Sequence, residues 1–293
     1  MTTGGATTGL ISGHTRVFGL IGHPVRHSLS PQMHTTLFGR MGLDAVYLAF
    51  DVHPDRSPLV GDAIRTLDLV GVNLTVPFKE RVIGQLDHRT QAVEEAGAAN
   101  VVTNVDGWLT GYNTDGEGLV QSLLDEHGWA PGGRRCLVLG AGGAGRAVAA
   151  SLAAAGAERV CVLNRTESRA RAAVEHLAHF SPRVAFDTAP LTAQAMAWEA
   201  PGADLVVNCL GSGAEGAVQA FDVSRLGADA VWVDINYWMQ DPPCKAACAA
   251  HGIAFVDGMG MLVHQGALSF ELFTGHPIDP AELRGILSAR HLG

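Results

Sequence analysis

Three glycines near the middle of the chain have the spacing of a dinucleotide-binding turn. Gly140, Gly142 and Gly145 form the pattern G-x-G-x-x-G directly after the apolar run at residues 136–139 and before an alanine-rich segment that ends at Gly156. The first glycine permits a tight turn, the second lets a pyrophosphate approach the backbone, and the third lets a helix pack on the strand. This context predicts that phosphate groups bind at the N-terminus of the helix.

A second group of polar residues precedes the glycine turn, in the segment VNLTVPFKE. Asn73 and Thr75 alternate along a predicted strand, so their side chains face one side of a sheet. Pro77 then carries Lys79 beyond the carboxyl end of the strand, where α/β proteins bind ligands. A satisfied Asn/Thr pair with a solvated lysine explains the segment equally well, and Asp115 is equally explained as a helix N-cap. Spacing alone does not decide between a site and these structural roles.

The elements that must position these residues alternate between strand and helix before the glycine turn. Ser30 and Pro31 predict an N-cap and a first-turn proline for the first helix. Asp106-Gly107 predicts a tight hairpin turn. Strands are expected at residues 15–22, 45–50 and 69–76, and a strand pair within residues 100–113. The alternation predicts an α/β layer with mostly parallel strands.

Beyond the turn the alternation continues and predicts a doubly wound parallel sheet. A second strand is expected between Gly156 and the segment that starts at Asn164. Further strands are expected at residues 183–186, 204–208, 230–234 and 253–258, with helices at 258–275 and 280–291 closing the chain. Such a sheet rarely needs that many helices after it, so we assign the last two helices to the first domain. The predicted fold is a Rossmann-type α/β domain at residues 115–257 and a second α/β domain built from both chain ends, residues 1–114 and 258–293.

Composition excludes several classes of partner. The formal net charge of −9 and the lack of a basic run argue against nucleic acid and anionic membranes. Five cysteines without a CxxC pair predict neither a disulfide framework nor a metal site. The first ten residues, rich in Gly and Thr, are expected to be an unstructured tail without a signal peptide, and no apolar run is long enough to span a membrane. We therefore expect a cytoplasmic protein.

Several segments together resemble the shikimate dehydrogenases, in their order and rough spacing from Gly19 to Phe273. The segments are GHPVRHSLSPQMH, VNLTVPFKE, GAANVV, GYNTDGEG, GAGGAGRA, NRTESRA and GMGMLVHQGALSFE. The resemblance implies NADPH-dependent, reversible reduction of 3-dehydroshikimate to shikimate in aromatic amino-acid biosynthesis. It also implies a small-molecule substrate, NADP as cofactor, no metal, and a monomer or homodimer.

The resemblance further assigns roles to individual residues. It implies that Lys79 and Asp115 carry the proton chemistry, because hydride transfer to a ketone leaves an alkoxide that must receive a proton. Which of the two donates in each direction is left open, as for any coupled pair. The implied substrate-binding residues are Ser28 and Ser30 on the carboxylate, Thr75, Asn100 and Gln265 on the ring hydroxyls, and Tyr237 near the substrate or nicotinamide. Ser30 as a helix cap, Gln265 as a surface residue and Tyr237 as a structural tyrosine are the alternatives.

The second strand of the nucleotide domain indicates which dinucleotide binds. An NAD enzyme places Asp or Glu about 20 residues after the glycine turn, to bind the ribose 2′-hydroxyl. This chain has Asn164, Arg165 and Thr166 there, with Arg169 following. Two guanidinium groups and a hydroxyl suit a 2′-phosphate. A pair of solvated arginines opening a helix is the alternative. The remaining predicted cofactor contacts are Ala141, Gly143 and Ala144 in the turn, and Gly258.

Some segments depart from the family pattern. Residues 206–216 lack the usual N-x-T segment and Gly-Met pair, so Ala214 and its loop are expected to contact the nicotinamide differently. Residues 238–245 lack the usual Y-x-P-x-x-T, and Thr35 stands where the family often has Asn. Four histidines of the first segment are expected in loops and at the surface: His14, His23, His27 and His34.

Other functions are compatible with these residues. Quinate or an aminoshikimate is an alternative substrate, because pocket shape decides between such close analogues. A non-catalytic NADP-sensing module is the alternative from another class. The presence of both Lys79 and Asp115 argues against that module.

Overall fold

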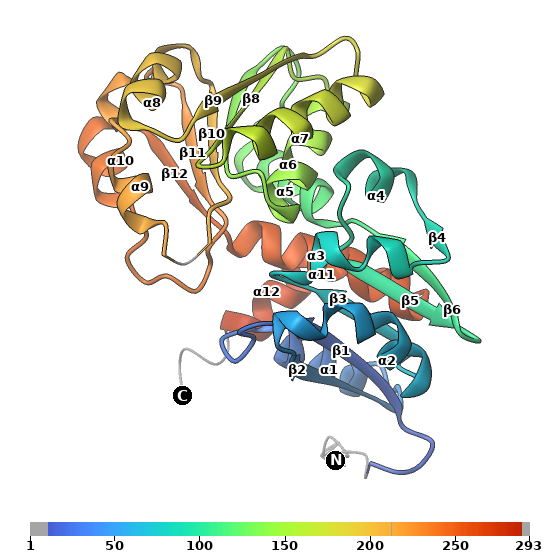
Figure 1. The fold of residues 1–293 in the computed structure, drawn as a ribbon. Helices are drawn as coiled ribbons and strands as arrows, with labels where there is room; N and C mark the ends of the chain where they lie inside the picture. Colours follow the sequence, from blue (N-terminus) through green and yellow to red (C-terminus); the bar gives the residue numbers. More distant parts are fainter. Residues whose placement is uncertain (1–10, 212, 289–293) are drawn as a thin grey trace, which may run out of the picture. The chain divides into compact units, whose positions relative to one another are not determined.

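The computed structural model describes residues 11–211 and 213–288, and the chain divides into two compact units. We call them the terminal unit, residues 11–93, 99–114 and 265–288, and the central unit, residues 94–98, 115–211 and 213–264. Figure 1 shows that both chain ends, blue to green and red, contribute to the terminal unit. The division differs from the predicted domain boundaries at residues 94–98 and 258–264. The tail expected at residues 1–10 lies outside the described residues.

The terminal unit has a six-stranded sheet in the order β2-β1-β3-β5-β6-β4. Its strands are β1 (Arg16–Gly22), β2 (Ala45–Asp51), β3 (Gly71–Leu74), β4 (His88–Arg89), β5 (Val101–Val105) and β6 (Trp108–Tyr112). β1 pairs in parallel with β2 and β3, but β5 is antiparallel to both β3 and β6. The sheet is therefore mixed rather than mostly parallel. The predicted hairpin causes this: Asp106 and Gly107 both have positive φ, 52° and 85°, and reverse the chain in a tight turn.

The helices of this unit differ in length, and α11 (Met259–Thr274), which it shares with the central unit, is the longest. They are α1 (Ser30–Arg40), α2 (Val60–Thr66), α3 (Phe78–Arg81), α12 (Pro280–Ser288) and the second half of α11; α4 (Gln91–Ala96) crosses the unit boundary. The predicted N-cap at Ser30 is wrong, because Leu29 occupies the cap position without a side-chain bond. Ser30 is the first helical residue, and its backbone N–H donates to the Ser28 hydroxyl at 3.2 Å.

His34 is a core residue, so its expected place in a loop or at the surface is wrong, whereas His14, His23 and His27 are exposed as expected. His34 lies on the buried face of α1, where its ring stacks on Tyr47 with centroids 4.6 Å apart and faces Phe270 at 6.0 Å. Among the described residues, neither ring nitrogen has a hydrogen-bond partner. Burial lowers the pKa of His34 from 6.5 to about 3, since charging an enclosed ring is costly.

This buried histidine predicts a loss of stability in acid. The unfolded chain binds a proton at His34 below about pH 6.5, while the folded chain does not until about pH 3. The contribution of neutral His34 to the free energy of unfolding is therefore complete above pH 6.5. It declines as the pH falls, by up to about 1.4 kcal/mol per pH unit. We expect the free energy of unfolding of His34→Phe, measured with urea between pH 7 and pH 4, to decline less steeply than that of wild type. His14→Ala, which removes an exposed histidine, should follow wild type; equal slopes for all three proteins would contradict the assignment.

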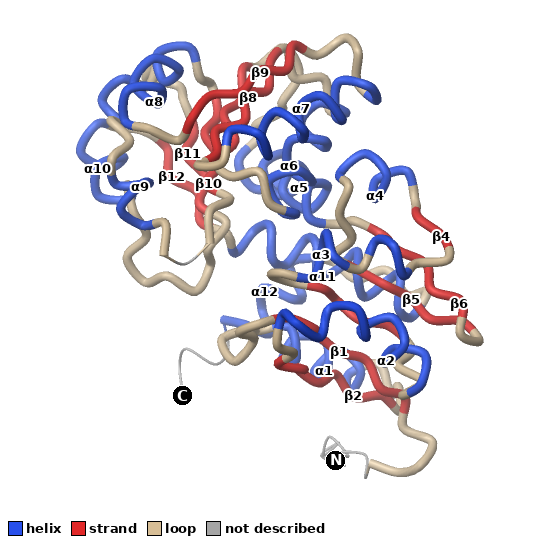
Figure 2. Tube along the Cα trace, viewed as in Figure 1, coloured by secondary structure: helices blue, strands red, loops and turns tan. Residues whose placement is uncertain are grey.

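The central unit confirms the predicted doubly wound sheet. Its strands are all parallel, in the order β12-β11-β10-β7-β8-β9. They are β7 (Arg135–Leu139), β8 (Arg159–Asn164), β9 (Ala185–Pro190), β10 (Leu205–Asn208), β11 (Val231–Asp234) and β12 (Ala254–Asp257). The helices are α5 (Asp115–His127), α6 (Gly143–Ala154), α7 (Glu167–Phe180), α8 (Ala193–Glu199), α9 (Glu215–Gln219), α10 (Lys245–His251) and the first half of α11. Figure 2 shows helices beside the strands of this sheet.

Alternate residues of the central strands enter two separate cores, which explains why the sheet is covered on both faces. Cys136 and Val138 belong to one cluster, and Leu137 and Leu139 to the other. All four side chains are at most 1% exposed. A strand buried on both sides requires a continuous apolar run, as these residues form.

The cysteines are reduced, and the described helices do not meet the requirements of a membrane crossing. All five cysteines are thiols, and burial raises the pKa of Cys136, Cys161 and Cys244 to about 12. No helix within residues 11–211 and 213–288 has both the length and the apolar character that a membrane crossing requires.

Candidate substrate and nucleotide sites

The glycine turn has the geometry that phosphate binding requires. Gly140 has φ +112°, a conformation that favours glycine. A Cβ at Gly145 would overlap the carbonyl oxygen of Gly140, so only glycine lets α6 approach the turn this closely. Gly142 is the N-cap of α6 with extended backbone, and the helix begins at Gly143. The first backbone N–H groups of a helix have no partner within it, which makes this end an anion site.

Asn164 connects the glycine turn to the segment that follows β8. Its side-chain oxygen accepts a hydrogen bond from the Ala141 N–H at 3.2 Å, and its amide donates to the Thr166 carbonyl at 2.9 Å. Arg165 and Arg169 are exposed beside the start of α7, whose N-cap is Thr166. The side chain of Asn164 thus holds the turn, and the two arginines follow it at the surface.

The two predicted carboxylate-binding hydroxyls lie together at the start of α1. Ser28 Oγ donates to Ser30 Oγ at 3.3 Å and accepts from the Ser30 N–H at 3.2 Å. Ser30 is buried and Ser28 is half-buried. A pair of neutral donors in this position suits a carboxylate without introducing a fixed charge.

Thr75 and Lys79 follow β3, as predicted for residues beyond the end of a strand. β3 ends at Leu74, so Thr75 lies in the turn; its N–H donates to the Ile21 carbonyl at 2.9 Å. The predicted strand was therefore too long, because the Val76-Pro77 turn interrupts it. Lys79 lies in α3 and is half-buried. Its backbone carbonyl accepts from Ala99 N at 2.8 Å, which places α3 against the segment that carries Asn100.

Asn100 is held at both ends of its side chain by one residue. Its Oδ1 accepts from the Thr114 N–H at 2.8 Å, and its Nδ2 donates to Thr114 Oγ1 at 2.9 Å. The hydroxyl of Thr114 reaches the carbonyl of Gln265 at 3.3 Å. Asn100 is 2% exposed, and Gln265 is half-buried on α11. The terminal unit thus joins two of the predicted hydroxyl-binding residues through Thr114.

Three further predicted residues belong to the central unit. Asp115 is buried and is itself the first residue of α5, so the helix begins at the carboxylate rather than after it. The ring of Tyr237 is half-buried and lies edge-on to Trp238, with centroids 5.2 Å apart. A Cβ at Gly258 would overlap the backbone of Ile235. Close packing therefore explains the glycine at this position without a bound cofactor.

A buried polar cluster at the ends of β10 and β11 escaped the sequence analysis. Asp234 Oδ2 accepts from Asn208 Nδ2 at 2.9 Å, and Asp234 Oδ1 accepts from Asn236 Nδ2 at 2.7 Å. Asn236 Nδ2 also donates to the Leu210 carbonyl at 3.0 Å. The cluster ties the two atypical loops together where each leaves the sheet. In the sequence, the signal for this cluster was that Asn208 and Asp234 each end a predicted strand, at residues 204–208 and 230–234.

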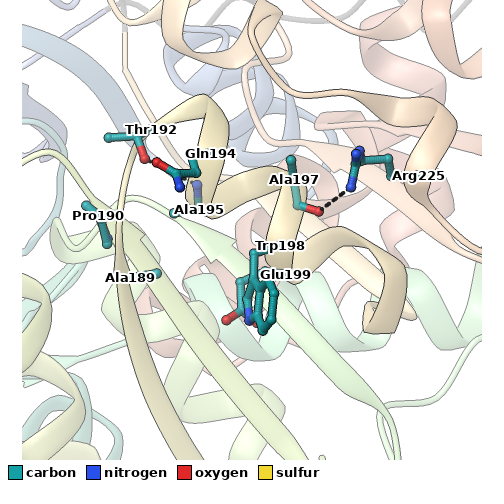
Figure 3. A pocket seen from close by; sticks show the side chains of 9 residues that line it. All are labelled: Ala189, Pro190, Thr192, Gln194, Ala195, Ala197, Trp198, Glu199 and Arg225. Carbon is teal, nitrogen blue, oxygen red and sulfur yellow. Dashed lines mark hydrogen bonds between the residues drawn. The ribbon is translucent and has the colours of Figure 1, made fainter.

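A surface hollow lies elsewhere, at α8. Its volume is about 450 Å³, and its lining includes Trp198, Glu199 and Arg225 but none of the predicted site residues. Figure 3 shows the Arg225 guanidinium hydrogen-bonded to the Ala197 carbonyl, at 3.0 Å. No three His, Cys, Asp or Glu side chains of residues 11–211 and 213–288 are arranged to hold a metal ion.

Three family models match successive parts of the chain. The shikimate dehydrogenase substrate binding domain matches residues 20–102. The shikimate / quinate 5-dehydrogenase model matches residues 126–235, and the shikimate 5'-dehydrogenase C-terminal domain matches residues 258–286. The matched regions contain the hydroxyl pair, the glycine turn and Gln265 respectively.

Relatives and solved structures agree over nearly the whole length. A shikimate dehydrogenase (NADP(+)) of Geobacter metallireducens is 40% identical over 275 residues, which are 94% of this chain and 96% of the relative. A crystal structure of a shikimate dehydrogenase in complex with NADP+ superposes with a TM-score of 0.85 at 31% identity, covering 98% of this chain and 99% of the other. The Thermus thermophilus enzyme in complex with NADP(H) and shikimate has a TM-score of 0.76 at 36% identity, with 92% and 98% coverage.

These similarities confirm the resemblance found in the sequence. A relative is 40% identical over 94% of this chain, and family models match in both units, so the chain belongs to the shikimate dehydrogenase family.

Proposed function

We propose that this chain catalyses the reversible, NADPH-dependent reduction of 3-dehydroshikimate to shikimate, a step of aromatic amino-acid biosynthesis. The observation that carries the proposal is the set of polar side chains in the terminal unit. It combines a hydroxyl pair for a carboxylate, Ser28 and Ser30, with amide groups suited to ring hydroxyls, Asn100 and Gln265. Thr75 adds a further hydroxyl. A site built to hydrogen-bond each substrate oxygen rejects analogues that lack one.

The two units divide the work in this proposal. The terminal unit binds the substrate and the central unit binds NADP. Parallel strands followed by a glycine turn support the second assignment, since dinucleotides bind at the carboxyl ends of such strands. Asp115 and Tyr237 of the central unit are proposed to contribute to the substrate chemistry.

The residues of the glycine turn fit a dinucleotide. The close approach of Gly145 to Gly140 brings the N-terminus of α6 to the turn, where Ala141, Gly142, Gly143 and Ala144 would present backbone to a pyrophosphate. Arg165, Thr166 and Arg169 would hold a 2′-phosphate. Bound NADPH would supply the hydride that reduces the ketone.

In this proposal, Lys79 and Asp115 carry out the proton transfer. Reduction leaves negative charge on the substrate oxygen, and the Lys79 Nζ ammonium can donate a proton to it. The Asp115 carboxylate accepts a hydrogen bond from the reacting hydroxyl. The pair shares the proton in the reverse direction.

Location follows from the cysteines. All five are thiols. Proteins of oxidising compartments tend to pair their cysteines, whereas the cytoplasm keeps them reduced. We therefore place the enzyme in the cytoplasm.

Removing the proposed proton donor should slow the chemical step. Lys79→Ala is expected to lower kcat for shikimate oxidation at least about 100-fold, with little change in KM, because general acid–base catalysis contributes at the transition state. Steady-state kinetics measures both. The matched control is Lys245→Ala, which removes the exposed second lysine of the chain and should keep wild-type rates. Near-normal kcat in Lys79→Ala would remove this residue from the mechanism.

Cofactor choice should depend on the two arginines after β8. Replacing Arg165 and Arg169 with Ala is expected to raise the KM for NADPH about 10- to 100-fold, the value of lost charge-assisted hydrogen bonds, and to change the KM for NADH little. Arg183→Ala removes an exposed arginine elsewhere in the same unit and serves as control. Equal effects on both cofactors would contradict a role in 2′-phosphate binding.

A four-way assay tests the activity itself, and quinate is the second candidate because the family model matching residues 126–235 describes shikimate and quinate dehydrogenases. The experiment compares oxidation of shikimate and of quinate, each with NADP+ and with NAD+. We expect the highest kcat/KM for shikimate with NADP+. Preference for quinate would reassign the substrate, and no turnover with any pair would favour a non-catalytic NADP-binding module.

A further inference from the structure

A continuous chain of buried hydrogen bonds runs through the terminal unit behind the proposed substrate-binding residues. Tyr47 on β2 donates its hydroxyl to Asn73 Oδ1 at 2.7 Å, and Asn73 Nδ2 donates to Ser269 Oγ at 3.0 Å. Ser269 Oγ donates to the Gln265 carbonyl at 2.8 Å. The Thr114 hydroxyl approaches the same carbonyl at 3.3 Å and Ser269 Oγ at 3.4 Å. The chain therefore ends on the backbone of Gln265.

The chemistry of the donors determines the orientation of Asn100. A backbone N–H can only donate, so the atom of Asn100 that faces the Thr114 N–H at 2.8 Å must be the carbonyl oxygen. The amide nitrogen then donates to Thr114 Oγ1 at 2.9 Å. The Thr114 proton is consequently directed away from Asn100, toward Gln265 or Ser269. Flipping the Asn100 amide would set two donors against each other.

Burial makes this arrangement costly to break. Thr114 is 4% exposed and Ser269 is fully buried. Water cannot replace a lost partner there, so each missing bond leaves an unsatisfied group. Behind Tyr47, the stacked ring of His34 has no hydrogen-bond partner among the described residues and fills space only by packing. Both Asn100 and α11 are thus held by residues that solvent does not reach.

We propose that Thr114 and Ser269 are positioning residues for shikimate binding, acting through Asn100 and Gln265. This inference rests on the proposed function and adds to it two residues outside the set expected to touch the substrate. Thr114 sets the orientation in which the Asn100 amide would meet a ring hydroxyl. Ser269 and Thr114 together fix the backbone from which the Gln265 side chain extends. Thr114 is also the residue before Asp115 in the chain.

A pair of substitutions at Thr114 separates its hydroxyl from its shape. Thr114→Val keeps the branched side chain but removes the acceptor of Asn100 Nδ2, whereas Thr114→Ser keeps the hydroxyl. We expect Thr114→Val to raise the KM for shikimate about tenfold, the value of one buried hydrogen bond, with the KM for NADP+ within about twofold of wild type. Thr114→Ser should restore the shikimate KM to within about threefold. Ser269→Ala should act in the same direction as Thr114→Val.

Ser122→Ala is the matched control for Ser269→Ala. Ser122 is also buried on a helix, with its hydroxyl bonded back to the Leu119 carbonyl at 2.9 Å, but it belongs to α5 of the central unit, whereas Ser269 belongs to the terminal unit. It should leave both KM values unchanged. Thermal unfolding of all four variants identifies any loss that merely reflects destabilisation.

The outcomes distinguish this inference from the proposed function. If neither wild type nor Ser122→Ala oxidises shikimate, the proposed function is wrong, and so is the inference that rests on it. If wild type is active and Thr114→Val has an unchanged KM for shikimate, only the positioning role is wrong. Equal losses in Thr114→Val and Thr114→Ser, or parallel rises in the KM values for shikimate and NADP+, would show that packing matters rather than the hydroxyl.

Discussion

The need to satisfy buried polar groups governs the terminal unit. Its interior contains amides and hydroxyls that a purely apolar core would exclude, and those around Thr114 bond to one another because water cannot replace a partner there. Thr114 meets this requirement for Asn100 with both its N–H and its hydroxyl. The network that results is directional, since each donor must face an acceptor. Polar atoms buried for structural reasons thereby orient the amides that the proposed substrate would meet.

The central unit must bind an anionic cofactor although the protein as a whole is acidic. A net charge of −9 repels phosphate at long range, so local groups must compensate. The N-terminus of α6 contributes partial positive charge at the glycine turn, and Asn164 holds that turn against the end of β8. Arg165 and Arg169 stand exposed nearby in sequence. In the terminal unit the neutral hydroxyls of Ser28 and Ser30 offer hydrogen bonds in place of charge.

The sequence predicted elements best where a local signal was strong. The Asp106-Gly107 turn and the all-parallel central sheet are both present, because a tight turn and a doubly buried strand each impose a distinctive pattern. Prediction failed where long-range packing decided. His34 was expected at the surface, yet it lies between aromatic rings of β2 and α11, which are distant from it in sequence. Ser30 was expected to cap α1, but Ser28 supplies the bond to its N–H and Leu29 takes the cap position.

By itself the sequence determined the types of residue available for the chemistry and the order of most elements that carry them. Lys79, Asp115, Asn100 and Gln265 stood out in the segments that resemble shikimate dehydrogenases, and the glycine spacing indicated where a dinucleotide binds. Only the tertiary structure revealed that Thr114 joins Asn100 to the α11 backbone. Bonds of this network link residues as far as 196 positions apart in the chain, and no local pattern encodes which distant donors and acceptors folding will bring within about 3 Å.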